Sequence, residues 1–451
     1  MSSSKSLRDI FGDVWDPILR LVSRADLVAL CLVSQASRAT TEAFLYSIIE
    51  WTWAHKVQYA PPIACFLRTI LQRPALANHV RRVLLLGDVF AGRPRFSIAD
   101  VDLDAAIGAI QDTELPYAPQ WIQSLRKGDM DAFVALLLSR CHRLVQVVVQ
   151  SNFTEESTHF MGMLFNSAVC TKTGAGLPTF QYLREVAYSL GWHPEIIGKH
   201  TKDVLPFFYL PAIRSLSVSL GNPLTLEWPL QPPDPLTITS LELTHMQEKY
   251  LGRILSTTRN VKTLRWEWYY CGGTNYTGSS CTIDLTEAFN ALQHISGTVE
   301  DLTIAATHGM GRGHGNPTVY IKGSLKALIG FDCLRKLSVP WVFLVGWSRD
   351  AGIRLADVIP RYIQDLTITD DLGALDDYDE WGQGTDVMPV LELWLRNWKL
   401  STPNLRKFTF YLEFASWEWG PVMRNTLLEV CNQYGVIAEI VKIHADTAGH
   451  N

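Results

Sequence analysis

The feature that most constrains this chain is a six-residue pattern, apolar-x-x-apolar-x-apolar, which recurs ten times after residue 79. Its last positions alternate between apolar and polar residues, which is typical of a strand with one buried face. A basic residue often follows the first apolar one. The copies are residues 80–85, 144–149, 183–188, 213–218, 238–243, 261–266, 299–304, 334–339, 363–368 and 405–410. The pattern therefore predicts ten short strands.

The intervals between copies carry helix-like segments at 115–138, 286–295, 324–329, 351–359 and 387–400. One strand and one helix per repeat of roughly 20–45 residues is typical of a solenoid, in which neighbouring repeats bury each other's apolar faces. We expect an α/β fold with a curved parallel sheet, strands on the concave side, helices on the convex side and right-handed connections. The longest interval, between the copies at 80 and 144, predicts a further, degenerate copy.

The apolar-x-x-Leu-x-Leu core resembles a leucine-rich repeat that lacks the usual asparagine ladder. Its turns must therefore be held by other means, and the unequal intervals imply inserted loops. The alternative architecture is a doubly wound α/β domain. That fold needs a glycine-rich turn after an early strand, and no such turn is present.

Residues 8–50 predict a compact helical module. Val14, Ile18, Leu21 and Val22 recur at helical spacing, and a second helix begins near Ser23. A third helix is expected from residue 37 to residue 46. About 40 residues cannot bury all of these apolar faces among themselves. The module is therefore expected to leave an apolar surface, covered either by another protein or by the rest of this chain.

This module resembles an F-box. The resemblance rests on residues 10–19, on Asp26-Leu27, on Leu30 and on Val33-Ser34, although Phe11 stands where the family has proline. It implies docking to the Skp-type adaptor of a cullin–RING ubiquitin ligase. The adaptor-binding residues it implies are Trp15, Ile18, Leu19, Leu27, Leu30, Val33 and Ser34.

The chain as a whole is similar to fungal-type F-box proteins. Residues 68–81 resemble their linker helix and first strand, and residues 427–431 and 435–436 resemble their closing helix and last strand. The predicted organisation is an F-box-like module at 8–50, a linker helix region at 51–79 and a leucine-rich-repeat-like solenoid at 80–451.

Aromatic residues near the strand ends are candidates for binding a protein substrate, because tryptophan and tyrosine are good interface anchors. Trp266, Trp268, Tyr270 and Trp341 are the candidates, and burial in the solenoid core is the alternative for each. The segment 370–381 carries six carboxylates in twelve residues. It predicts a solvated loop, or a docking point for a basic partner segment.

Other classes of function find little support. Forty Lys and Arg residues against 45 Asp and Glu residues give a net charge of −5, which argues against a nucleic-acid binder. No apolar run reaches the roughly 18 residues of a membrane span, and the N-terminus lacks a secretory signal, so we expect a cytoplasmic or nuclear protein. Nucleophile, phosphate-loop and zinc motifs are absent from the sequence, and no cofactor or metal is expected.

The sequence thus favours a non-enzymatic substrate-recognition adaptor of an SCF-type ubiquitin ligase, with the adaptor and cullin scaffold at one end and an unknown protein substrate on the repeats. The alternative is a ubiquitin-independent interaction scaffold in which the helical module caps the array. An enzyme with an unrecognised site is the third hypothesis.

Overall fold

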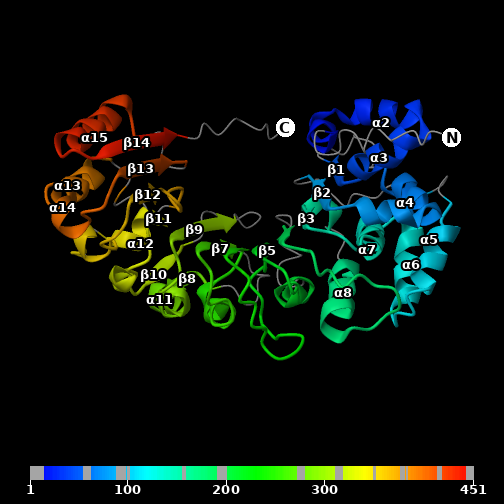
Figure 1. Cartoon of the computed structure of the whole chain (residues 1–451). Helices are drawn as coiled ribbons and strands as arrows, with labels where there is room; N and C mark the ends of the chain where they lie inside the picture. The colour runs from blue at the N-terminus through cyan, green and yellow to red at the C-terminus, as the bar shows by residue number, and fades with distance from the viewer. Residues whose placement is uncertain are drawn as a thin grey trace. The chain divides into compact units, whose positions relative to one another are not determined.

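The computed structural model describes residues 15–53, 62–87, 98, 102–154, 159–189, 201–271, 280–309, 318–348, 352–375, 381, 384–413 and 419–442. The chain divides into two compact units, which are described separately (Figure 1). Unit 1 comprises residues 1–196, 202–214 and 229–231. Unit 2 comprises residues 197–201, 215–228 and 232–451.

Unit 1 begins with a helix that covers residues 15–21 of the described part. The α-helices that follow are α2 (Arg24–Val33), α3 (Gln35–Leu45), α4 (Ile63–Gln72), α5 (Asp104–Gln111), α6 (Ala118–Lys127), α7 (Met130–Arg140) and α8 (Phe160–Phe165). Its strands are β1 (Ile48–Thr52), β2 (Arg82–Leu86), β3 (Gln146–Val149) and β4 (Glu185–Tyr188). The short helix α9 (Thr201–Val204) follows at the boundary with unit 2.

The strands of unit 1 form a parallel sheet in chain order. Val83, Val147 and Val186 stand in register across β2, β3 and β4, and all three are buried. The core continues into α7, whose residues from Ala132 to Leu138 are almost completely buried. Their burial is what fixes the sheet of this unit against its helices.

Unit 2 repeats the same arrangement with more strands. Its strands are β5 (Ser215–Ser219), β6 (Ser240–Thr244), β7 (Thr263–Cys271), β8 (Thr282–Asp284), β9 (Asp301–Gly309), β10 (Tyr320–Lys322), β11 (Lys336–Pro340), β12 (Asp365–Thr369), β13 (Lys407–Leu412) and β14 (Ile437–Lys442). Its helices are α10 (Leu251–Leu255), α11 (Leu285–Leu292), α12 (Trp341–Val345), α13 (Gly384–Leu395), α14 (Trp398–Ser401) and α15 (Pro421–Gln433).

The main sheet of unit 2 is parallel and runs β5-β6-β7-β9-β11-β12-β13-β14, while β8 and β10 pair in a separate small sheet. Helices α11 to α15 lie on one face of the main sheet (Figure 1). Leu337 and Leu366 are in register and are buried, whereas Ser338 and Thr367, one position further on, are partly exposed. One face of these strands is therefore covered and the other is polar and accessible.

All ten predicted strands are present as β2 to β7, β9 and β11 to β13, and each begins two residues after the first apolar residue of its copy. The mixed α/β class with a large, open parallel sheet is confirmed. Within each unit the strand order never reverses, so the switch point of a doubly wound domain is missing from the described strands.

Backbone hydrogen bonds show how neighbouring copies are held without an asparagine ladder. In most copies the carbonyl of the second residue accepts the amides of the second and third residues of the next copy. The Arg335 carbonyl, for example, accepts from the amides of Gln364 (2.7 Å) and Asp365 (3.1 Å). The Ser47 carbonyl accepts in the same way from Arg81 and Arg82, so the ladder extends to the turn before β1.

Several predictions about the intervals are wrong. Among the described residues between the copies at 80 and 144 there is no degenerate copy, because β2 pairs directly with β3 and the interval holds α5, α6 and α7. The helix predicted at 115–138 is split into α6 and α7 by Gly128, whose φ of 78° is the left-handed conformation that ends a helix. The segments 324–329 and 351–359 form short 3₁₀ turns instead of α-helices.

Candidate docking surface on the N-terminal module

The helix α2 is apolar almost all round its circumference. Its last seven residues, 27–33, include no charged or amide side chain, yet Leu27 alone in this helix is buried. Leu32 and Val33 are 82% and 73% exposed, and Leu21 in the preceding helix is 88% exposed. A helix that is hydrophobic all round is normally covered on every side. In α2, by contrast, the described residues cover only the side that carries Leu27.

Two caps hold α2 and α3 in place. The Ser23 hydroxyl accepts a hydrogen bond from the Asp26 amide (3.2 Å) and donates one to the Asp26 carboxylate (2.6 Å). The Ser34 hydroxyl accepts from the Ser37 amide (3.1 Å), while the Ser37 hydroxyl donates to the Leu30 carbonyl (2.7 Å). These bonds satisfy groups that a helix terminus leaves unpaired. The corner between the helices is therefore fixed, and the exposed side chains project from an ordered frame.

The predicted adaptor-binding residues divide between the interior and the surface of the module. Leu19 and Leu27 are buried and act as its core, and Ser34 is the N-cap of α3. Trp15 and Leu30 are partly exposed, and Ile18 and Val33 are exposed. Residues 8–14 of the predicted motif lie outside the described residues.

The predicted adaptor-binding set leaves out three exposed apolar residues, Leu21, Val28 and Leu32. Val28 and Leu32 are four residues apart and share one face of α2, so their spacing was a signal that they belong to one stripe. Together with Ile18 and Val33 they form the group of five exposed apolar side chains that is called the apolar surface below.

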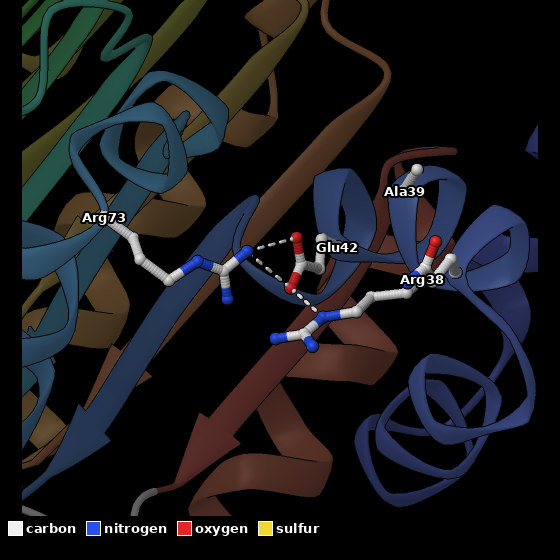
Figure 2. A pocket seen from close by; sticks show the side chains of 5 residues that line it. Arg38, Ala39, Glu42 and Arg73 are labelled. Carbon is white, nitrogen blue, oxygen red and sulfur yellow. Dashed lines mark hydrogen bonds and ion pairs between the residues drawn. The ribbon is translucent and has the colours of Figure 1, made fainter.

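An open pocket of about 360 Å³ lies between α3 and the end of α4 (Figure 2). The lining residues are Gln35, Arg38, Ala39, Glu42 and Arg73. At its centre the Glu42 carboxylate accepts from Arg38 Nε (2.7 Å) and from Arg73 Nη2 (2.8 and 3.0 Å). Burial alone would raise the pKa of Glu42, but the bonds to the two arginines outweigh it and the pKa is lowered. The pocket is thus where the module is tied to α4.

The predicted substrate-binding aromatics are mostly in the core. Trp266, Trp268 and Trp341 are fully buried, which is the alternative considered for them, and Tyr270 is partly exposed. The indole of Trp266 donates to the Met246 carbonyl (2.8 Å), as expected for a buried tryptophan. These three tryptophans therefore give no accessible anchor for a partner.

The acidic segment at 370–381 is not a wholly solvated loop. Asp370 is buried and accepts from the Glu413 amide (2.8 Å), and Asp371 accepts from the Ala306 amide (2.7 Å). Burial raises the pKa of Asp371 to about 6. These two carboxylates replace backbone partners at the ends of strands, while residues 376–380 lie outside the described residues.

One contact resembles a nucleophile–base pair. Ser219 Oγ lies 3.0 Å from His245 Nδ1, and burial lowers the pKa of His245. Ser219 is 2% exposed, so a substrate could not reach its hydroxyl in this structure. Over the described ranges, no group of three or more His, Cys, Asp or Glu side chains is placed to hold a metal ion. None of the helices in those ranges has the length and apolar character to span a membrane.

Comparison with known proteins adds no family to these observations: no protein-family model matches the chain, and no curated protein is significantly similar to it.

Proposed function

We propose that this chain is the substrate-recognition subunit of an SCF-type ubiquitin ligase. The N-terminal module, an F-box-like unit, docks the Skp-type adaptor and through it the cullin scaffold. The strand array, acting as a leucine-rich-repeat-like solenoid with its open sheet face concave, holds a protein substrate. The observation that carries the proposal is the apolar surface on an ordered module.

The energetics favour a protein partner for that surface. Fully burying a leucine or valine side chain contributes about 1.5–3 kcal/mol. Leu21, Leu32 and Val33 are each more than 70% exposed, so covering these three alone recovers several kcal/mol before the costs of association. That gain offsets part of the cost of association, and a partner makes it only by covering these side chains with apolar surface of its own.

The sheet supports the second half of the proposal. In β11, β12 and β13 the residues Ser338, Thr367 and Thr409 lie in register on the face that helices do not cover. Each offers a hydroxyl that can donate and accept hydrogen bonds. A broad, polar, accessible strip of this kind suits recognition of a protein surface, and the buried Ser219 hydroxyl makes the enzyme hypothesis the weakest.

No covalent chemistry by this chain is needed in this mechanism. Docking at one end and substrate binding at the other hold the substrate's lysines near a ubiquitin-charged enzyme on the scaffold. The rate gain comes from effective concentration and orientation.

The test is adaptor binding by the full chain with Leu32→Asp and Val33→Asp combined. We expect the dissociation constant, measured by calorimetry, to rise at least tenfold, because two carboxylates would have to be desolvated at the interface. The matched control is Leu400→Asp with Val422→Asp, since these unit 2 residues are 78% and 80% exposed. The control should bind like wild type.

Ubiquitin-independent scaffolding is the second candidate, because the module also packs like a cap. The turn at Ser47 joins the backbone ladder, β1 pairs with β2, and Arg73 of the segment after α4 holds Glu42 of α3. If the wild-type chain binds no Skp-type adaptor, the ligase proposal is overturned and the capping role is what remains.

A further inference from the structure

The starts of the strands in unit 1 carry a row of arginines. Arg81, Arg184 and Arg214 each occupy the second position of their copies, and Arg143 lies two residues before Val145, which holds that position in its own copy. The Arg81 carbonyl accepts from the Val145 amide, the Val145 carbonyl from Arg184, and the Arg184 carbonyl from Arg214. The ladder therefore stacks these positions on adjacent strands, about 4.8 Å apart per strand.

Three of these residues, Arg81, Arg143 and Arg184, are called the arginine edge, and their charges are poorly compensated. Within the described residues, Arg81, Arg143 and Arg184 take part in no ion pair. Glu185, at the first position of β4, is the one carboxylate among the starts of β2, β3 and β4, and it is exposed. Arg143 and Arg184 are also exposed, so their guanidinium groups are available to a partner.

The corresponding edge of unit 2 is partly neutralised, although Arg335 and Arg406 also hold second positions there. Lys262 pairs with Glu300 (2.9 Å), both at the second position of their copies. Lys407, at the start of β13, pairs with Glu439 (2.5 Å). The repeat pattern alone therefore does not demand unpaired cations at strand starts, and ion pairs offset part of the charge in unit 2.

The local electrostatics agree with a clustered charge. Burial, and then the neighbouring charge of Arg143, lower the pKa of Arg81. Burial and the charge of Arg81 also lower the pKa of His79. Tyr182, 45% exposed, precedes Leu183 and lies close enough to influence Arg81. Like charges held together with few carboxylates nearby attract an anionic partner.

The layout favours several carboxylates over one phosphate group. Arg81 already donates to the Asn78 carbonyl (2.7 Å), and the row is spread over successive strands, so the guanidinium groups do not converge on one point. In an extended peptide, side chains on one face repeat about every 6.6–7 Å, which long arginine side chains can follow.

We propose that the arginine edge binds an extended, Asp- and Glu-rich segment of another protein. Calling that protein the ligase substrate rests on the proposed function, but the binding itself does not require the adaptor.

The test uses the purified full chain without adaptor and a fluorescein-labelled twelve-residue peptide containing six Asp or Glu residues. We expect saturable binding by anisotropy that weakens with added salt and disappears for the peptide with Asn and Gln in their place. Arg143→Ala with Arg184→Ala should weaken binding at least tenfold. The matched control, Arg335→Ala with Arg406→Ala, removes two charges from second positions in unit 2 and should bind like wild type.

Equal weakening by both double variants would overturn the proposal, because the loss of binding would then follow from the change in net charge and not from the position of the arginines. Absence of peptide binding would overturn it too, as would tighter binding of a single-stranded oligonucleotide that depends on Arg143 and Arg184. Thermal melting confirms that each variant folds. Leu32→Asp with Val33→Asp should leave peptide affinity unchanged, so failure of adaptor docking and failure of peptide binding are separate results.

Discussion

The helices α2 and α4 are both ten residues long and belong to the same unit, but they bury their apolar residues differently. In α4 the buried residues Ile63, Leu67 and Ile70 repeat at helical spacing, and the fully exposed positions within it are Cys65, Arg68 and Gln72. In α2 only Leu27 is buried, and Leu32 and Val33 face solvent. The contrast teaches that the apolar content of a helix does not show whether its side chains are buried in the core of their own unit.

A second contrast concerns two carboxylates. In the module, two arginines keep the pKa of Glu42 low although burial acts to raise it. In unit 2, burial raises the pKa of Asp371 to about 6, and its hydrogen bond with the Ala306 amide only partly offsets this. The module therefore stabilises charge at its edge, whereas the strand array holds a carboxyl group that burial makes easier to protonate.

The largest expected effect is on the free energy of unfolding, which an alanine substitution in α4 should lower far more than one in α2. Leu67→Ala removes a fully buried side chain and should lower the free energy of unfolding by about 2–5 kcal/mol. Leu32→Ala should change it by no more than about 0.5 kcal/mol, because the side chain is already in solvent. Chemical denaturation of the full chain, followed by far-UV circular dichroism, measures both. Similar losses for the two variants would mean that α2 is covered as α4 is.

Asp371→Asn should alter the pH dependence of unit 2. A carboxyl group whose pKa is raised on folding makes the protein less stable as pH rises from the unfolded value, near 3.9, to about 6. Asparagine keeps an oxygen for the Ala306 amide and carries no charge. The variant should therefore gain stability relative to wild type across that range, by at most about 3 kcal/mol.

Thermal melts between pH 4 and pH 7 test this, with Asp332→Asn on the surface of unit 2 as the matched control. A difference between Asp371→Asn and wild type that stays constant over the whole range would contradict the assignment.

Glu42→Gln should have the smallest effect and the opposite sign of pH dependence. A lowered carboxyl pKa stabilises the folded state above the unfolded value, and this stabilisation is lost as pH falls through the folded pKa. We expect a loss of about 0.5–1 kcal/mol at pH 7 that vanishes in acid. The same denaturation series at pH 7 and pH 3 measures it. The control is Glu392→Gln, which removes a single exposed pair with Arg396 (2.8 Å). An equal loss at both pH values would rule out the ion pairs as its cause.

The strands were predictable because their pattern is local. Each copy places two apolar residues on one face at period two, and burial of that face follows directly, as for Leu337 and Val339. The strand β1 was missed because Ile48–Thr52 lacks the full pattern and sits at the edge of the sheet. Of the three helices between β2 and β3, α6 and α7 were predicted as one helix at 115–138, whereas α5 was not predicted, since interval length does not reveal whether an insertion forms a strand or a helix.

The candidate site was predictable only in part. The sequence indicated an apolar module, but period and spacing do not show which side of α2 meets α3, so Leu27 was expected at the surface and Leu32 was overlooked. The tryptophans of β7 illustrate the same limit. Alternation puts Trp266 and Trp268 on one face, yet helix packing decides that this face is the covered one.

Hydrogen exchange of the full chain with and without a Skp-type adaptor tests the central claim most directly. The account predicts that amides in residues 15–33 become strongly protected on mixing, while those of α4, already packed, change little. Unchanged exchange over residues 15–33 in the presence of saturating adaptor would contradict it.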